Sequence, residues 1–449
     1  MPPAVDSQPA SPAATPIPFA DARSVLQALR DELLPETLRG LTPAEREARW
    51  AGWVKSRDAA IRQRVAQGDE DSVVNLVFFG TTFTRRPRPS ESELSMLLTR
   101  PADGLAALRP RVDDFIAAVA VPGTDERLQI ARRVIAKAGI DPATAPGRDR
   151  LRRHLEERML AVAAESASVT TAVDAGHALT TSTLFRDRGL SSDTSLVVDY
   201  GVDNAIQSLA RVRPNGVPIR RVAIVGPGLD YADKQRGYDF YPPQTIQPFA
   251  VIDSLIHHGL GDAASLRVTA FDLSPQVLAH LAAARTRAMA GTPYGLVLPR
   301  NPDRMWTQGL VAYWRRLGDR VGVDGPAITP PAAAGGVQVR GVRVRPAVVL
   351  AVTPRDLNIV LARDERPPSE KFDLVIATNI LVYYDVFEQS LAVANITSML
   401  APGGLFLTNT RLTLLPGSPL RSVGYTDTVY TADPQGRGET GDRVYTYGR

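Results

Sequence analysis

The stretch "RRVAIVGPGLDYADKQRGYDFYPP", residues 220–243, combines a strand pattern with a glycine turn. The apolar, mostly β-branched run from Val222 to Val225 is typical of a buried strand, and it stops at Gly226-Pro227-Gly228. Glycines lack a Cβ atom, so a ligand can lie against their backbone. In open α/β sheets, ligands bind at the carboxyl ends of the strands. The stretch therefore predicts a central strand followed by a ligand site, although a tight turn without any ligand also fits this motif taken alone.

The composition narrows the class of protein. The chain has 449 residues, a formal net charge of +4, and 44% hydrophobic residues, which suits a globular protein of two domains. The small, dispersed basic excess does not indicate a nucleic-acid-binding protein. Without cysteine, disulfides and thiol nucleophiles are excluded, and the five histidines lack metal-ligand spacing, so no metal is expected. Neither a signal peptide nor a run of about 20 apolar residues is present, which predicts a cytoplasmic protein without membrane contact.

The first part of the chain predicts a mainly helical region. Residues 1–19 are rich in Pro, Ala and Ser, and we expect a disordered leader there. Residues 20–190 show helical periodicity, including a capping box at Thr42-Pro43-Ala44-Glu45 that opens a helix running to about Gly68. The run "VVNLVFFGTTF" (73–83) predicts a strand. We expect the helical region to act as a lid or as a docking surface for a substrate.

From about residue 195 the pattern alternates between strands and helices. The expected strands are 221–225, 266–271, 347–352, 372–377 and 404–409, and the expected helices are 245–258, 274–290 and 385–400. Residues 291–346 form an insertion with one helix, and the runs 424–431 and 443–447 form a terminal hairpin. The predicted fold class is α/β, a Rossmann-like, doubly wound and mostly parallel sheet over 195–449, with a terminal antiparallel hairpin and a preceding helical region.

A second strand supplies a candidate ligand residue. "LRVTAFDLSP" ends in Asp272, whose carboxylate can accept hydrogen bonds from the 2′- and 3′-hydroxyls of a ribose. Asp272 could instead cap the next helix, but Ser274, followed by Pro275, is the better N-cap. A dinucleotide fingerprint needs a third glycine and an immediate helix. Tyr231 stands at that position and a polar loop follows, so nicotinamide use is disfavoured.

Later motifs carry a family resemblance. "FDLVIATNILVYYD" (372–385) and "MLAPGGLFLTNT" (399–410) together resemble the class I S-adenosylmethionine-dependent methyltransferases. The first of these is most similar to the chemotaxis-receptor group of that family. "PRDLNIVL" (354–361) and "DRVYTYGR" (442–449) match the segment after the third strand and the seventh strand of the family. The resemblance covers about residues 195–449 and implies S-adenosylmethionine as the cofactor.

The resemblance also implies roles for individual residues. Gly226 and Gly228 would bound the methionine and ribose end of the cofactor, and Asp272 would hold the ribose hydroxyls. Asp356 and Leu357 would frame the adenine, and Asn379 would lie beside the sulfonium. Leu273 completes the cofactor-binding set. The family often has an acidic residue two positions before the first glycine, where this chain has Ile224. We expect Asp230 or Asp233 to receive the methionine ammonium group instead.

Methyl transfer requires alignment of the acceptor more than acid–base chemistry. The candidate catalytic residues are Asn379, Tyr238, Asp239 and Tyr383. The methyl acceptor is not identified by the sequence; a small molecule or a protein is favoured over a nucleic acid, and the oligomeric state is not indicated. Two alternatives stay open. The chain could bind S-adenosylmethionine without catalysis, as an interaction module, or it could be a nicotinamide-dependent oxidoreductase.

Overall fold

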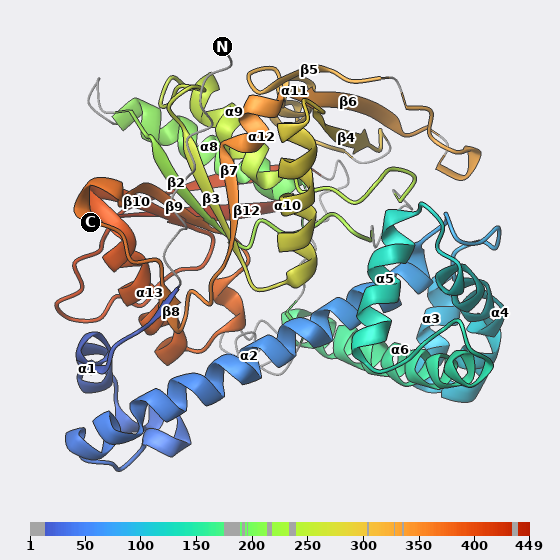
Figure 1. The fold of residues 1–449 in the computed structure, drawn as a ribbon, viewed down its shortest axis with the longest axis horizontal. Coiled ribbons are helices and arrows are strands. Elements are labelled where there is room, and N and C mark those ends of the chain that lie inside the picture. The colour runs from blue at the N-terminus through green and yellow to red at the C-terminus, as the bar shows by residue number, and fades with distance from the viewer. Residues whose placement is uncertain are drawn as a thin grey trace.

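The computed structural model describes residues 14–174, 189–190, 194, 196–212, 218–232, 239–302, 305–326, 328–334, 336–432 and 439–449. Figure 1 shows a strand-rich part of the chain, with the N-terminal helices arranged along and beside it. No helix among these residues is long and apolar enough to span a membrane.

A seven-stranded sheet, in the order β11-β12-β10-β9-β2-β3-β7, forms the centre of the fold. Its strands are β2 (Arg221–Val225), β3 (Arg267–Asp272), β7 (Val352–Asp356), β9 (Phe372–Ala377), β10 (Leu400–Thr408), β11 (Arg421–Ala432) and β12 (Glu439–Gly448). The first five of these are parallel to one another, whereas β12 runs antiparallel to both β10 and β11. The predicted Rossmann-like sheet with its terminal hairpin is therefore present, and β2 lies in its interior, between β9 and β3.

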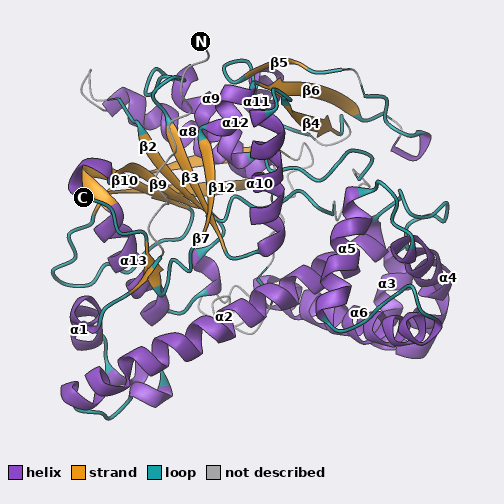
Figure 2. Ribbon diagram, viewed as in Figure 1, coloured by secondary structure: helices purple, strands orange, loops and turns teal. Residues whose placement is uncertain are grey.

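Helices cover both faces of this sheet (Figure 2). They are α8 (Leu196–Val212), α9 (Gln247–His257), α10 (Pro275–Met289), α12 (Pro346–Leu350) and α13 (Val386–Met399). Along β2, Val222 and Ile224 belong to one hydrophobic core, and Ala223 and Val225 belong to the other. Because successive side chains of a strand point to opposite faces, the sheet is buried on both sides.

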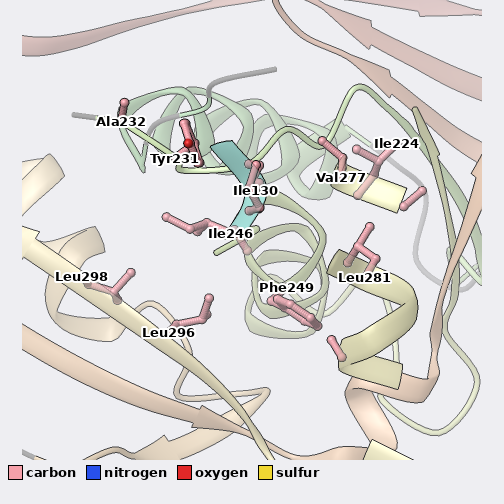
Figure 3. Close-up of a cluster of buried hydrophobic side chains, with 14 of the residues drawn as sticks. Ile130, Ile224, Tyr231, Ala232, Ile246, Phe249, Val277, Leu281, Leu296 and Leu298 are labelled. Carbon is pink, nitrogen blue, oxygen red and sulfur yellow. The ribbon is translucent and has the colours of Figure 1, made fainter. Parts of the chain in front are cut away.

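The region before the sheet is mainly helical, as predicted. It consists of α1 (Phe19–Ala28), α2 (Pro43–Phe79), α3 (Glu91–Thr99), α4 (Pro101–Ala120), α5 (Glu126–Lys137) and α6 (Ala145–Asp174), with short 3₁₀ turns at Asp31–Leu33 and Glu36–Leu38. The predicted capping box is confirmed, since the Thr42 side chain accepts from the Glu45 amide and the Glu45 side chain accepts from the Thr42 amide. In Figure 3, Ile130 of α5 points into the same apolar cluster as Ile224 of β2 and Phe249 of α9, so this region shares a core with the sheet.

The predicted strand at 73–83 is wrong. Residues up to Phe79 continue α2, which passes Gly68 without a break. Val73, Val74, Leu76, Val77 and Phe78 are all buried. A helix end buried on every side has no polar face, so its sequence resembles that of a buried strand.

The predicted disordered leader is wrong for its last residues. A short strand, β1 (Thr15–Pro16), pairs antiparallel with β8 (Ala362–Arg363), and Ile17 is buried beside the Trp50 indole, whose N–H donates to the Ile17 carbonyl. Residues 1–13 lie outside the described part of the chain.

Two further expectations need correction in the second half. The segment predicted as a strand at 347–352 is mostly helix α12, because Pro346 starts a helical turn, and the strand β7 begins only at Val352. The insertion contains the expected helix, α11 (Gln308–Arg316), together with a three-stranded antiparallel sheet that the sequence did not predict. Its strands are β4 (Tyr294–Arg300), β5 (Gly322–Asp324) and β6 (Gln338–Val344), in the order β4-β6-β5. A 3₁₀ turn of the insertion lies at Ala332–Ala334. Two more 3₁₀ turns, beyond the insertion, lie at Pro368–Glu370 and Leu381–Tyr383.

Candidate functional site

A pocket opens at the carboxyl ends of β2, β3 and β9. Val225 and Gly226 line it from β2, Phe271 and Asp272 from β3, and Thr378 from the end of β9. This is the edge at which an open parallel sheet binds its ligands. The pocket therefore lies where the sequence predicted a ligand site, at the carboxyl end of the central strand β2.

The glycine turn after β2 has a conformation that other residues rarely adopt. Gly226 and Gly228 both have a φ of +70°. A Cβ atom on Gly226 would lie 2.1 Å from the Cδ1 atom of Ile380, which follows β9 and also lines the pocket. The Gly226 amide donates to the carbonyl of Phe271 on β3 (2.8 Å). The β3 strand and Ile380 thus fix the turn, and glycine at 226 keeps the backbone bare on the pocket side.

Asp272 places a buried carboxyl group at the tip of β3. The residue is 9% exposed, and its Oδ1 atom accepts the Ser274 amide hydrogen (2.8 Å). Burial raises the pKa of Asp272 to about 7, and the nearby Asp69 carboxylate acts in the same direction, although backbone amides of Ser274, Gly228 and Leu273 oppose this. The predicted N-cap is confirmed, because the Ser274 hydroxyl accepts from the Gln276 amide. A carboxylate has about four lone-pair positions, so Asp272 can accept further hydrogen bonds from a ligand.

Of the two residues predicted to contact an adenine ring, Leu357 lines the pocket and Asp356 does not. Leu357, which is 2% exposed, lines the pocket, as does Leu273. Asp356 lies instead in the neighbouring groove. There its carboxylate accepts hydrogen bonds from both terminal nitrogens of the Arg62 guanidinium, at 3.0 and 2.9 Å. Successive residues at a strand end point in opposite directions, so Asp356 and Leu357 face different sides. The expectation for Asp356 therefore needs correction.

Asp230 also lies away from the pocket. The chain after Gly228 bridges to Gln244, and the Asp230 carboxylate accepts from the Tyr241 hydroxyl (2.9 Å) and the Gln244 amide (3.0 Å). It therefore braces the loop after β2 rather than reaching the pocket. Asp233, the other residue expected to receive the methionine ammonium group, is outside the described residues.

Two of the candidate catalytic residues line the pocket and two do not. Asn379 and Tyr383 lie in its wall. Asp239 is buried away from it and accepts hydrogen bonds from the amides and hydroxyls of Thr81 and Thr82, between 2.6 and 3.1 Å. It anchors the loop after α2, so its expected catalytic role is not supported by its position. Tyr238 is outside the described residues.

Gln247 is a pocket residue that sequence reasoning missed. It is 2% exposed in the first turn of α9, and its Nε2 atom donates to the Thr378 hydroxyl (3.0 Å). The buried Oε1 atom accepts no hydrogen bond from any described residue. Nearby, burial raises the pKa of Asp199 to about 8, against the influence of the Gln247 amide. The only signal in the sequence was a polar residue beside Pro248 at the start of an otherwise apolar helix.

Residues of α2 and α8, with Leu190 and Thr194 between them, supply the opposite wall of the pocket. Val65 of α2 lines it, together with Leu190, Thr194 and Val198. Figure 1 shows α2 as a long diagonal helix passing the end of the sheet. The Leu190 amide donates to the Arg64 carbonyl (2.9 Å), and a Cβ atom on Gly68 would lie 2.0 Å from the Leu190 carbonyl oxygen. The sequence led us to expect a lid or a docking surface from the helical region, but no local motif singled out Val65 or Val198 as residues of this wall.

Side chains of α2 also contact the turns and helices that flank the sheet. Arg64 donates to the Tyr383 carbonyl (3.2 Å), and the Ser274 hydroxyl donates to Asp69 (3.3 Å). Arg57 pairs with the buried Glu388 at 2.6 Å. No cluster of three or more potential metal ligands occurs among the described residues. The pocket is therefore a partly apolar cleft with a bare backbone turn and a buried carboxyl group, which suits an organic ligand carrying hydroxyl groups.

No protein-family model and no curated protein matches the sequence. Solved structures align at low similarity. The N-methyltransferase NodS from Bradyrhizobium japonicum WM9, in complex with S-adenosylhomocysteine, is 12% identical, and the alignment covers 56% of this chain and 86% of that one with a TM-score of 0.26.

Two other aligned structures hold S-adenosylmethionine. Magnesium protoporphyrin IX methyltransferase (ChlM) from Synechocystis PCC 6803 is 10% identical over 64% of this chain and 97% of that one, with a TM-score of 0.27. The glycopeptide N-methyltransferase MtfA is 11% identical over 54% of this chain and 76% of that one, with a TM-score of 0.19. With TM-scores below 0.5, these alignments assign no activity, and the fold rests on the order and direction of the strands described above.

Proposed function

We propose that this chain is an S-adenosylmethionine-dependent methyltransferase. The observation that carries the proposal is the combination, in one pocket, of the positive-φ glycine turn after β2 with the buried carboxyl group of Asp272 at the tip of β3. A bare backbone admits a ligand close to the central strand, and the adjacent carboxylate accepts hydrogen bonds from a ribose.

The pocket residues fit each part of this cofactor. Asp272 would hold the ribose hydroxyls, and Leu357, Leu273 and Ile359 would provide an apolar surface for the adenine. At the other end, the turn at Gly226 would accommodate the methionine part. The buried Gln247 Oε1 atom would be an acceptor for its ammonium group, in place of Asp230.

The cofactor supplies a methyl group on an already activated sulfonium leaving group. The protein then has to align an acceptor and exclude water, which is a proximity effect. Val65, Leu190 and Val198 form an apolar wall opposite the sheet and would exclude water. Asn379, just after β9, and Tyr383, in the 3₁₀ turn that follows, would face the acceptor. We expect that acceptor to be a small molecule or a protein side chain.

A nicotinamide cofactor fits this pocket less well. Its pyrophosphate binds at the N-terminus of a helix that follows the glycine turn directly. Here α9 begins only at Gln247, after the chain has turned through the Asp230–Gln244 bridge. The remaining alternative is a module that binds S-adenosylmethionine without transferring its methyl group.

Calorimetric titration with S-adenosylmethionine and S-adenosylhomocysteine tests the proposal, with Asp272→Ala as the variant and Asp356→Ala as the matched control. We expect micromolar binding that Asp272→Ala weakens by about 100-fold, on the order of 3 kcal/mol for two lost charge-assisted hydrogen bonds. Asp356→Ala should change it little. Binding of NADH instead, or of neither compound, would overturn the proposal. Tight binding with no labelled methyl transferred to any acceptor in small-molecule and protein pools would favour the binding module.

A further inference from the structure

Asn379 stands out in the backbone of the pocket. Its φ of +58° is the one positive value at a non-glycine position among the described residues. Such a conformation costs roughly 1 kcal/mol and persists where surrounding contacts enforce it. Asn379 follows β9 closely, lines the pocket and is exposed.

Two other polar side chains hold Asn379 in this conformation. The Asn379 backbone amide donates to the Oδ1 atom of Asn409 (2.8 Å), and the Asn409 Nδ2 atom donates to the Oδ1 atom of Asn379 (2.6 Å). The same Nδ2 atom donates to the Oδ2 atom of Asp442 (2.9 Å). Asn409 follows β10 and Asp442 lies on β12, so three neighbouring strands meet in this contact.

These contacts determine which way each amide points. A backbone N–H can only donate, so the Asn409 atom that faces it is the oxygen. A carboxylate can only accept, so the Asn409 atom that faces Asp442 is the nitrogen. Both contacts therefore give the same orientation of the Asn409 amide. In that orientation its Nδ2 atom is the one that donates to the Asn379 side chain. The Asn379 amide therefore turns its oxygen to Asn409 and its Nδ2 atom away from it.

We propose that Asn409 and Asp442 are positioning residues that fix the Asn379 amide with its N–H groups available to a molecule in the pocket. The Nδ2 atom of Asn379 makes no hydrogen bond to another residue in the described part of the chain. A bound methyl acceptor must then present an atom with a lone pair at this point, such as a carbonyl or carboxylate oxygen, and not an ammonium N–H. The assignment of the acceptor's chemistry depends on the proposed function, whereas the orientation of the amide does not.

The Asn409→Asp variant, made in the Asp442→Asn background so that two carboxylates do not face each other at 2.9 Å, reverses this arrangement by replacing the side-chain amide with a carboxylate of nearly the same shape. The carboxylate still accepts the Asn379 backbone amide, but it can no longer donate to the Asn379 oxygen. The Asn379 side chain should therefore rotate so that its Nδ2 atom donates to the introduced carboxylate and its oxygen faces the pocket. Asp442→Asn is the matched control, because an asparagine oxygen at 442 still accepts from Asn409 and keeps the original orientation.

Nuclear magnetic resonance of protein labelled with ¹⁵N at asparagine reads the orientation directly, with Asn379→Ala identifying the Asn379 signals. We expect its side-chain N–H groups to exchange freely with water in the unsubstituted protein and in Asp442→Asn, and to be protected in the double variant with Asn409→Asp. The same exchange rates in all three folded proteins would overturn the proposed positioning role. Melting temperatures and circular dichroism establish that each variant is folded.

Two small probes test the predicted selectivity in the presence of S-adenosylhomocysteine. Acetate should shift the Asn379 signals of the unsubstituted protein, and methylammonium should not. In the double variant with Asn409→Asp the preference should reverse. Equal responses to both probes, with the orientation confirmed, would overturn the lone-pair requirement. Failure of S-adenosylhomocysteine to bind, measured separately by calorimetry, would overturn the proposed function and leave the positioning result intact.

Discussion

The two walls of the pocket are built differently. The sheet wall, formed by Gly226, Asp272, Leu357 and Asn379, presents bare backbone, a carboxyl group and an amide. The helix wall, formed by Val65, Leu190, Thr194 and Val198, presents mostly apolar side chains. The first wall can recognise the atoms of a ligand, and the second mainly covers them. The sheet wall would therefore recognise a ligand, and the helix wall would enclose it.

The walls also differ in how they are held. Continuous backbone ladders connect β2 with β3 and β9. The helix wall is attached by packing in a shared core and by separate side-chain contacts, among them Arg57 with Glu388, Arg62 with Asp356, and Asn358 with Asp58. Separate contacts can be removed one at a time, whereas a ladder resists single substitutions. Substitutions in the two walls should therefore have different consequences.

Gly226→Ala should strongly weaken ligand binding to the sheet wall. The new methyl group would collide with Ile380 at 2.1 Å and would strain a backbone with a φ of +70°. We expect S-adenosylhomocysteine affinity to fall at least about 100-fold, or roughly 3 kcal/mol, by calorimetry. Gly403→Ala is the control, since its φ is +73° but no atom lies within 4 Å of the added Cβ. Equal affinities for the two variants would contradict the close-packed turn.

Arg57→Ala should loosen the helix wall more than Arg62→Ala. Removing Arg57 leaves the Glu388 carboxylate, whose side chain is 2% exposed, without its cation. Arg62 and Asp356 are 41% and 51% exposed, so water can replace their contact. We expect losses in the free energy of unfolding of about 2–4 kcal/mol for Arg57→Ala and under about 1 kcal/mol for Arg62→Ala, measured by urea denaturation. The reverse ranking would show that burial does not govern these pairs.

Gly68→Ala should displace the helix wall without touching the sheet wall. Its Cβ atom would meet the Leu190 carbonyl oxygen at 2.0 Å, so residues 189–190 must move away from α2. We expect the protein to be destabilised by about 2 kcal/mol, with increased proteolysis near residue 190. Gly52→Ala in the same helix meets no atom within 4 Å and should stabilise the protein by up to about 1 kcal/mol. A stabilising effect of both substitutions would refute the close contact.

The smallest expected effect is a pH dependence of the sheet wall. Burial raises the pKa of Asp272 to about 7, so its neutral form predominates below that pH. Ribose hydroxyls donate to the charged form, so binding releases a proton and affinity rises with pH until about 7. We expect S-adenosylhomocysteine affinity to increase up to about tenfold between about pH 6 and 8. Asp272→Asn should bind more weakly and lose this dependence; a pH dependence that survives in the variant would assign the titration to another group.

Local sequence patterns were sufficient for the parts of the fold that depend on neighbouring residues. The apolar run before Gly226, the cap at Ser274 and the capping box at Thr42 were all predicted, because each uses backbone preferences acting over a few residues. The family resemblance of the later motifs added Leu357 and Asn379, both of which line the pocket.

Tertiary contacts decided the rest. Asp356, expected at the adenine, is held by Arg62, which is 294 positions away in the chain, and Asp239 is held by Thr81 and Thr82. The apolar end of α2 is helical because surrounding residues bury it, and Leu190 reaches the pocket because Gly68 leaves room for it. Local sequence was enough to predict the central strand and the bare turn that follows it, since both depend on neighbouring residues. The direction in which each polar side chain points, and the wall opposite the sheet, depend on partners distant in sequence, and only the folded structure brings those together.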